Sequence, residues 1–286
     1  MKCIILPNPY CDKQFRCAVR TAEILRQSGA EVAAALPFGA DRTAEAPESL
    51  HLTDLDSALA GCDVLICLGG DGTILHTSKL AASRGLPILG INIGTLGFMA
   101  ELESADLEPL RELAAGKYRL EERMMLHAEV CADGRTVFSE DGLNDAVVSK
   151  GSVARELHMS VSCGSSNLLS FSGDGTIVAT PTGSTAYSFS AGGPIVDPLT
   201  SSLVVTPICA HGQNANSFVL DGSRVLTMTV ERSGRKSAFL SVDGGRAFRL
   251  EGGDTVTVTR SEKVTRLVRL HHRNFFDTVN KKFYNK

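Results

Sequence analysis

The sequence predicts two domains: an N-terminal α/β domain with a parallel sheet, followed by an all-β, sandwich-like domain. Three observations support this prediction. Short apolar runs alternate with helical patterns in the N-terminal part of the chain. Short β-rich segments separated by Gly, Asp, Asn and Ser follow them, and 286 residues are enough for two cores. We place the α/β domain at 1–117, the β domain at 118–270 and a helical tail at 271–286.

In the N-terminal part, the periodicity changes repeatedly from strand-like to helix-like. Residues 12–28, for example, carry apolar side chains at helical spacing, and the pattern ends at Gly29. In chain order we expect a strand at 3–6, a helix at 12–28, a strand at 31–35, a helix at 52–60, a strand at 64–68, a helix at 74–83 and a strand at 87–91. This order is typical of a parallel sheet with right-handed crossovers, which binds ligands at the carboxyl ends of its strands.

Beyond about residue 118 the sequence pattern changes to one typical of short strands with turn residues between them. The expected strands lie at 118–131, 136–138, 145–149, 157–163, 168–172, 177–179, 203–208, 217–220, 224–230, 238–242 and 254–260. The tail at 274–284 mixes polar and apolar residues, and we expect it to be helical.

Composition and charge argue against several classes of protein. The formal net charge is −3 and no long run of Lys and Arg occurs, so nucleic acid is not an expected partner. No stretch approaches the roughly 18 apolar residues of a membrane span, and the apolar part of the N-terminus is too short for a signal peptide. Eight cysteines without a CxxC pair predict neither a disulfide scaffold nor a thiolate metal site. We therefore expect a cytoplasmic protein without membrane association.

The first motif is Gly-Gly-Asp-Gly-Thr at 69–73, directly after the apolar run 64–68. Glycines permit unusual backbone dihedrals and let a ligand approach the main chain closely. The first amides of the following helix can add to an anion site. The pattern favours phosphate handling, with Asp71 at the mouth of the cleft. The alternative is an ordinary strand-to-helix turn in which Asp71 is a cap.

A second glycine-rich strand exit reads Ile-Asn-Ile-Gly-Thr-Leu-Gly-Phe-Met at 91–99. Two such exits in one parallel sheet are expected to face the same cleft. The alternative is a tight turn ahead of a linker helix.

The longest informative run lies in the β part, at 172–193. It contains Thr-Pro-Thr-Gly-Ser-Thr-Ala-Tyr-Ser at 180–188, which predicts a short helix with hydroxyl caps that ends at Gly192. Small hydroxyl residues bury little apolar area, so folding alone gives little reason for them here. We interpret these hydroxyl groups as hydrogen-bonding groups for a ligand.

Together these segments resemble the NAD kinases, the family that phosphorylates NAD to NADP. The resemblance covers nearly the whole chain in order and includes Glu-Arg-Met-Met-Leu at 122–126 and Leu-Asn-Asp at 143–145. The motif at 69–73 also occurs in lipid kinases and, shortened, in phosphofructokinases, whereas the block at 180–187 is close to diagnostic. The resemblance implies an NAD kinase-like fold, an α/β domain followed by a β-sandwich, in a homodimer or homotetramer.

The implied reaction moves the γ-phosphoryl group of ATP to the 2′-hydroxyl of the adenosine ribose of NAD. Another nucleoside triphosphate or polyphosphate is an alternative donor. By the resemblance, Asp71 is the proton acceptor, and Gly72 lets the ligand approach the main chain. Mg²⁺ is expected on the triphosphate, since this ion keeps waters and takes few protein ligands. No protein ligand of the ion is predicted.

The resemblance also implies contacts to NAD. Asn144 and Asp145 match the pair that binds the adenosine end, with a turn ahead of a strand as the alternative. Asp174 matches a position that contacts NAD, in some members across a subunit interface. The residues that match the lining of the nucleotide pocket are Thr185, Ala186, Tyr187, Ser188, Phe189 and Ser190. Among them, Tyr187 offers a ring for stacking.

Three further candidates each have a simpler alternative. Phe98 can line the same pocket or belong to the core. Arg155 stands where the family often has a basic contact to the ligand, and the alternative is a solvated charge. His76 follows Asp71 by five residues and can touch phosphate, or it is a surface residue.

The chain departs from the family pattern in three places. Asn216 replaces a usual arginine, Gly245 a common glutamine, and Ser172 a frequent arginine or aromatic residue. Loss of a guanidinium removes a forked phosphate donor worth about 1–3 kcal/mol. Two alternatives to an NAD kinase therefore stay open: a catalytically weak dinucleotide-binding sensor that has lost arginines, and a kinase for a lipid or sugar acceptor.

Overall fold

The computed structural model describes residues 1–37, 46–151, 156–211, 216–231, 237–271 and 274–284. The chain forms two compact units, of which unit 1 contains Met1–Glu122 and Thr265–Lys286 and unit 2 contains Arg123–Val264. This division differs from the expected domains at 118–122 and 265–270, which lie in unit 1 together with the tail. The physical reason is that Arg266 and Leu267 pair in parallel with Pro87 and Ile88 of the N-terminal sheet.

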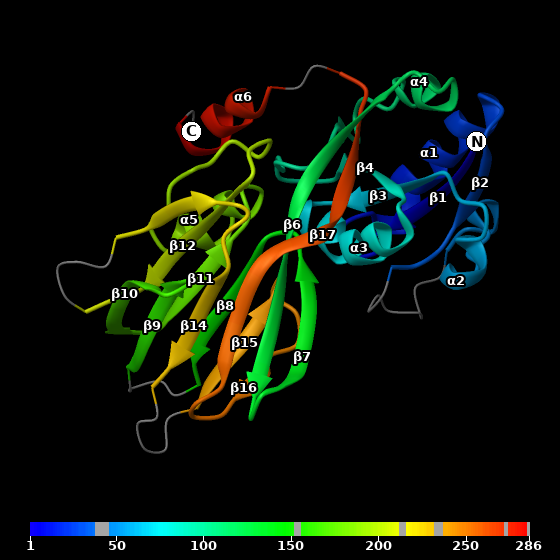
Figure 1. Ribbon diagram of the computed structural model, residues 1–286. Helices are drawn as coiled ribbons and strands as arrows, with labels where there is room; N and C mark the ends of the chain where they lie inside the picture. The colour runs from blue at the N-terminus through cyan, green and yellow to red at the C-terminus, as the bar shows by residue number, and fades with distance from the viewer. Residues whose placement is uncertain (38–45, 152–155, 212–215, 232–236, 272–273, 285–286) are drawn as a thin grey trace. The chain divides into compact units, whose positions relative to one another are not determined.

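Unit 1 is built on the parallel sheet that the sequence predicts (Figure 1). Its strands are β1 (Lys2–Pro7), β2 (Glu31–Ala34), β3 (Val64–Gly69), β4 (Pro87–Asn92) and the short β5 (Leu102–Glu103). The order is β2-β1-β3-β4, β5 also pairs with β4, and each of these pairs is parallel. The residues of β3 and β4 are all buried, which explains their continuous apolar runs.

The helices of unit 1 follow the predicted order, with shifted ends. They are α1 (Arg16–Gln27), α2 (Leu55–Ala58), α3 (Asp71–Arg84), α4 (Leu110–Ala114) and α6 (Phe275–Val279), joined by 3₁₀ turns at Lys13–Phe15 and Glu48–Leu50 and a π-helical turn at Asn280–Tyr284. Helix α1 begins after the expected residue 12, and α3 begins at Asp71 instead of residue 74. Apolar residues of α1 and α4 form one core with β1, β3 and β4.

Unit 2 contains the antiparallel part of an eleven-stranded sheet, whose parallel strands belong to unit 1, and a separate six-stranded antiparallel sheet. The first has the order β10-β9-β14-β17-β6-β7, with bounds Ser166–Gly173, Leu157–Cys163, Leu226–Val230, Thr255–Arg269, Arg119–Ala132 and Arg135–Gly142. The second has the order β13-β12-β11-β8-β15-β16, with bounds Phe218–Asp221, Ser202–Ile208, Gly175–Ala179, Asp145–Lys150, Ala238–Val242 and Phe248–Leu250. A 3₁₀ turn at Gly183–Thr185 and the helix α5 (Tyr187–Ser190) follow β11. Strands β6 and β17 have residues in both units.

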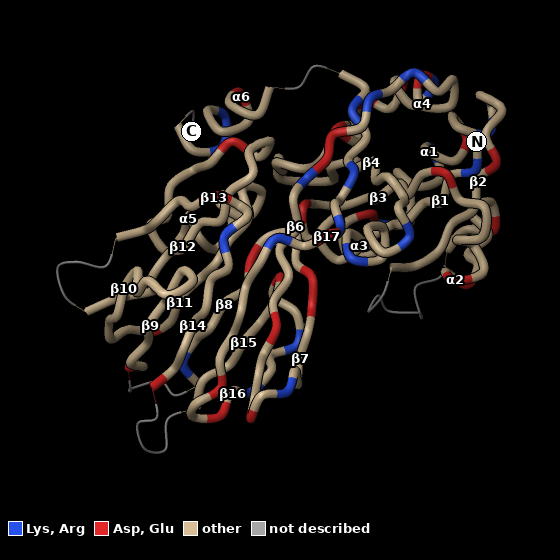
Figure 2. The backbone as a smooth tube through the Cα atoms, in the orientation of Figure 1, with Lys and Arg blue, Asp and Glu red and all other residues tan. Residues whose placement is uncertain are grey.

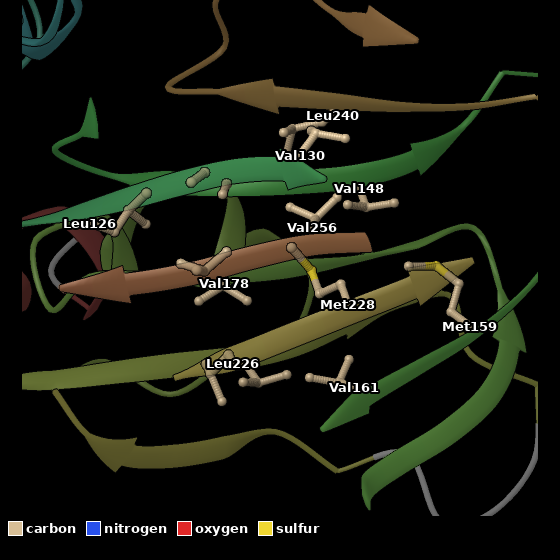
Figure 3. Packing of buried hydrophobic residues seen from close by; sticks show 14 of the residues in the cluster. Leu126, Val130, Val148, Met159, Val161, Val178, Leu226, Met228, Leu240 and Val256 are labelled. Carbon is tan, nitrogen blue, oxygen red and sulfur yellow. The ribbon is translucent and has the colours of Figure 1, made fainter. Parts of the chain in front are cut away.

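The main core of unit 2 draws apolar side chains from strands of both sheets, among them Leu126, Val148, Val178, Met228 and Val256 (Figure 3). A smaller core on β8, β11 and β12 includes Ile177 and Val204, and Ala191 and Val196 from the segment after α5 pack against it. The structure thus confirms the predicted fold class, an α/β unit and an all-β sandwich-like unit.

Charged residues are distributed along both units (Figure 2). Lys and Arg alternate with Asp and Glu along the long strands instead of gathering in one run. In the described part of the chain, no helix is both long and apolar enough to cross a membrane.

Candidate functional site

Asp71 stands at the junction between β3 and α3. The buried strand ends at Gly69, Gly70 is the cap residue of the helix, and Asp71 is its first residue. A side chain at position 69 would overlap Thr73, which explains the glycine there. Gly72 on the first turn of α3 and His76 on the second are both exposed to solvent. The helix begins three residues earlier than expected.

The second glycine-rich turn holds the Asp71 carboxylate. The Phe98 N–H donates to Asp71 Oδ2 at 2.8 Å, and the Met99 N–H donates to Oδ1 at 3.0 Å. A Cβ atom at Gly97 would overlap the same carboxylate, so only glycine permits this approach. The two strand exits therefore meet at one point, as the sequence predicts, and the meeting point is a carboxylate with both oxygens hydrogen-bonded.

Phe98 belongs to an aromatic cluster with the C-terminal tail. Its ring centroid lies 5.6 Å from that of Phe283 and 6.0 Å from that of Phe275. The Lys282 ammonium lies 4.5 Å above the ring of Phe98, within cation–π range. The tail therefore packs directly on the residue whose amide holds Asp71. Phe98 is half-buried in this cluster, and its place in the nucleotide pocket stays a prediction.

Asp145 begins strand β8 in unit 2, and Asn144 directly precedes it. Asp145 is 5% exposed, and burial raises the pKa of its carboxyl group to about 7, with a further contribution from the charge of Asp243. Asn144 is half-buried, and its main-chain carbonyl accepts the Thr180 N–H at 2.8 Å. The pair therefore lies directly beside the start of the hydroxyl-rich block.

Most hydroxyl groups of this block have partners inside the chain. Thr180 Oγ1 donates to the Leu143 carbonyl and accepts the Gly183 N–H, and Ser184 Oγ donates to the Pro181 carbonyl. These bonds fold the turn, which corrects our interpretation of the hydroxyl groups as reserved for a ligand. The physical reason is that a tight buried turn leaves many backbone groups to be satisfied, and short hydroxyl side chains reach them.

The predicted lining residues differ in their exposure. Ser188 is fully buried and its hydroxyl lies 2.9 Å from that of Thr206, while the Thr185 hydroxyl donates to the Thr182 carbonyl. Tyr187 is 46% exposed, which leaves its ring open for stacking. The remaining residues of the segment are Ala186 and Phe189, both half-buried, and Ser190, which is exposed.

Asp174 does not lie beside Asn144 and Asp145. It precedes β11, whose Gly175 pairs with Ser149, whereas Ala179 at the other end pairs with Asp145. The two carboxylates are thus at opposite ends of β8, about 17 Å apart along the strand. The Lys150 ammonium binds Asp174 at 2.6 Å.

Arg155 lies outside the described residues, as does much of the segment that replaces the usual arginine. At the edges of that segment, His211 and Asn216 are exposed. Sequence analysis did not find Lys150 as the partner of Asp174, nor Asp243 as the partner of 143–145. The signal for Asp243 was present in Ser-Val-Asp-Gly-Gly at 241–245, which we considered only for its missing glutamine.

The described residues contain no group of three or more His, Cys, Asp or Glu side chains that is arranged to hold a metal ion. They therefore do not form a metal centre on their own. A cavity of about 420 Å³ in unit 2 is lined by His127, Asp141 and residues 259–263. Burial raises the pKa of Asp141, but hydrogen bonds from Lys263, His127 and Ser261 outweigh it and lower the pKa overall. No predicted site residue lines this cavity.

Two family models match the chain in the order of its units. Residues 3–118 match the ATP-NAD kinase N-terminal domain, and residues 143–270 match the ATP-NAD kinase C-terminal domain. The chain belongs to the NAD kinase family. Its resemblance to this family, inferred from the motifs, is therefore confirmed.

Curated NAD kinases are similar over most of their length. The NAD kinase of Symbiobacterium thermophilum is 48% identical over 221 residues, which cover 77% of this chain and 78% of the relative. The NAD kinase of Acetivibrio thermocellus is 38% identical over 81% of this chain and 80% of the relative. The chain is accordingly a phosphotransferase with NAD kinase function, and the alternatives of a sensor and of a lipid or sugar kinase are set aside.

Two solved structures share the fold of this chain. Yeast NADH kinase complexed with NADH has a TM-score of 0.86 at 24% identity and covers 100% of this chain and 88% of its own. An NAD kinase from Archaeoglobus fulgidus in complex with ATP has a TM-score of 0.76 at 23% identity and covers 99% of this chain and 98% of its own. At these identities, the similarity establishes the fold.

Proposed function

We propose that Asp71 is the catalytic carboxylate of this NAD kinase and accepts the proton of the 2′-hydroxyl of the adenosine ribose of NAD. The observation that carries this proposal is the convergence of both glycine-rich turns on Asp71. The Phe98 and Met99 amides each occupy one oxygen, and each oxygen retains a further lone pair for a substrate hydroxyl.

The amides orient the carboxylate before substrate arrives. Phosphoryl transfer passes through a loose transition state and depends mainly on positioning and charge stabilisation. A fixed carboxylate beside the hydroxyl satisfies that requirement, since it aligns the attacking oxygen and takes its proton as the bond to phosphorus forms. Gly72 next to it leaves the main chain open to the ligand.

In unit 2, Asn144 and Asp145 bind the adenosine end of NAD in this proposal. An amide with two donors and two acceptors suits an adenine edge or a ribose diol. A carboxyl group with a pKa of about 7 can accept or donate a hydrogen bond near neutral pH. The exposed ring of Tyr187 stacks on a base.

The other predicted contacts differ in how much of each residue is exposed to a ligand. Thr185, Ala186, Phe189 and Ser190 keep at least part of their surface for the ligand, while Ser188 acts from beneath through its hydroxyl pair. His76 is exposed and can reach phosphate from α3. Phe98 contributes its amide to Asp71 more than its ring to a pocket. Asp174 and Arg155 remain assigned to NAD contacts by the family resemblance.

ATP enters as its magnesium complex in this proposal. The described residues form no metal cage, so the ion is treated as part of the donor substrate and no step is assigned to a protein ligand.

We further propose a homodimer or homotetramer that acts in the cytoplasm. The eight free cysteines, of which Cys3 and Cys67 are buried, suit a reducing compartment. Light scattering on the purified protein measures its oligomeric state.

The test of the catalytic role is the variant Asp71→Asn. We expect its affinity for NAD to stay within a few-fold of wild type and its kcat to fall at least about 100-fold, because an amide cannot take the proton. NADP formation from NAD and MgATP is followed with a coupled dehydrogenase. The control is Asp54→Asn, which alters an exposed carboxylate that accepts the Ser57 N–H at the start of α2. Unchanged turnover in Asp71→Asn removes the assignment.

A further inference from the structure

The segment 143–145 is held from one side by a single carboxylate distant in sequence. Asp243 Oδ2 accepts the Leu143 N–H at 2.7 Å, and Oδ1 accepts the N–H groups of Asn144 at 2.7 Å and Asp145 at 3.1 Å. Asp243 is 7% exposed, so these bonds are shielded from water. Three successive amides on one carboxylate fix the backbone of the segment more tightly than one strand pairing does.

Local structure explains why Asp243 reaches these amides. It follows β15, whose Val242 pairs with Ala146 of β8, and its own N–H donates to the Asp145 carbonyl at 2.9 Å. Its backbone adopts a left-handed conformation with φ of 53°, which Asp and Asn tolerate better than most residues. A Cβ atom at Gly142 would lie 3.1 Å from Asp243 Oδ1 and 2.7 Å from the Val242 side chain, so glycine keeps this approach open.

The opposite side of the segment is also held. The Thr180 hydroxyl donates to the Leu143 carbonyl, and its N–H donates to the Asn144 carbonyl at 2.8 Å. A Cβ atom at Gly183 would overlap the same Asn144 carbonyl, so the turn packs directly on it. Amides and carbonyls of 143–145 are therefore bound from two directions, and only the side chains of Asn144 and Asp145 remain to meet a ligand.

We infer that Asp243 is a positioning residue for NAD: its carboxylate fixes the segment 143–145 and thereby sets the affinity for the adenosine end. This inference rests on the proposed role of Asn144 and Asp145. Asp243 itself touches no substrate. Its contribution appears in the binding of NAD and not in the phosphoryl-transfer step, which belongs to Asp71 in the other unit.

The test is Asp243→Asn, because asparagine keeps the shape and tolerates the left-handed backbone. Its NH₂ group would face N–H donors where Oδ2 or Oδ1 now accepts, so at least one of the three bonds is lost. We expect the Kd and KM for NAD to rise at least about 10-fold, with kcat at saturating NAD within about threefold and the KM for ATP unchanged. Calorimetric titration with NAD gives the Kd without turnover.

The matched control is Asp221→Asn. Asp221 is also a carboxylate at a turn of unit 2 and accepts the Ser223 N–H at 2.9 Å, but it is the last residue of β13 and binds no amide of the segment 143–145. Asp221→Asn should leave the KM for NAD unchanged. Asp243→Glu, which keeps the charge and both acceptors, should recover part of the affinity that Asp243→Asn loses.

A structural role alone would give a different result. A lower melting temperature with an unchanged Kd for NAD in the folded protein overturns the inference. If Asp243→Asn does not fold, Thr180→Val decides, since it removes a bond from the other side of the same segment. An unchanged Kd in that variant overturns the claim that bonds around 143–145 set the affinity.

Variants of Asn144 and Asp145 distinguish a failure of their proposed adenosine role from a failure of the inference about Asp243. If Asn144→Ala and Asp145→Asn leave the Kd for NAD unchanged, the proposed adenosine role fails and the inference fails with it. If these variants weaken binding and Asp243→Asn does not, the inference alone fails.

Discussion

At the scale of single residues, a carboxylate held by backbone amides occurs twice in the molecule. Asp71 accepts two N–H groups and Asp243 accepts three. Charge-assisted bonds of this kind are shorter and stronger than neutral ones, so they fix a loop without a metal or a disulfide. In both cases glycine next to the carboxylate makes room, at Gly97 for Asp71 and at Gly142 for Asp243.

Asp145 gives a pH prediction at the same scale. Burial and then the charge of Asp243 raise the pKa of its carboxyl group from 3.8 to about 7. Between these values the folded protein holds a proton that the unfolded chain has lost, so unfolding releases a proton and the stability falls as the pH rises toward 7. Asp145→Asn should therefore be more stable than wild type by about 2–4 kcal/mol at pH 8, with little difference at pH 4.

Urea denaturation at the two pH values measures this difference. The same variant should bind NAD more weakly, because it lacks the carboxylate that we assign to the adenosine end. A variant that is equally stable at pH 8 and pH 4 relative to wild type would contradict the raised pKa. The exchange of stability for ligand affinity is common at binding sites.

At the scale of elements, the C-terminal tail supports the turn that carries Phe98. Phe275 of α6 and Phe283 of the π-helical turn both pack on the Phe98 ring, and the Phe98 amide binds Asp71. The tail therefore packs on the residue whose amide binds the proposed catalytic carboxylate. Helix α6 begins at Asn274, whose side chain caps it by accepting the Phe276 N–H at 3.0 Å.

Removal of one ring from this cluster should loosen the turn. Phe283→Ala should destabilise unit 1 by about 1–2 kcal/mol, less than a fully buried phenylalanine, and should speed amide exchange at Phe98 and Met99. Hydrogen exchange followed by NMR measures the two amides. The control is Tyr284→Ala, since Tyr284 is 70% exposed. Equal exchange at both amides in wild type and Phe283→Ala would contradict this role of the tail.

At the scale of the whole molecule, the C-terminal part of β17 is fixed in unit 1 by a buried ion pair. Arg269 Nη1 lies 3.2 Å from Glu101 Oε2, and the exposed fractions of the two side chains are 6% and 0%. Glu101 Oε1 also accepts the N–H groups of Leu270 and His271. Glu101→Gln should destabilise the protein by about 1–3 kcal/mol, because the buried guanidinium then keeps only Glu121, 2.9 Å from Arg269 Nη2, as a charged partner.

Urea denaturation compares this variant with Glu108→Gln. Glu108 forms an exposed pair with Arg111 at 2.9 Å, and such pairs contribute little, so that variant should stay within about 0.5 kcal/mol of wild type. A similar small effect for both variants would mean that the buried pair does not fix the end of β17.

Patterns close in sequence were sufficient for the fold class and for the Asp71 turn. The succession of strands and helices along unit 1 follows from alternating periodicity, whereas the strand order in its sheet required the structure; the meeting of the two glycine-rich turns follows from the parallel neighbours β3 and β4. Contacts between residues far apart could not be predicted in this way. Asp243 binds amides 98 to 100 positions away, and Arg266 of β17 pairs with Pro87, so the role of Asp243 and the boundary of unit 1 required the structure.

The discontinuity of unit 1 has a consequence for biosynthesis. Residues 123–264 form a contiguous unit that is complete as soon as it leaves the ribosome, whereas the N-terminal sheet lacks the strand beside Pro87 and Ile88 until residues 266–267 emerge. The polypeptide that is made first is thus finished last, and a nascent chain that has left the ribosome only as far as residue 264 would hold a complete unit 2 and an incomplete unit 1.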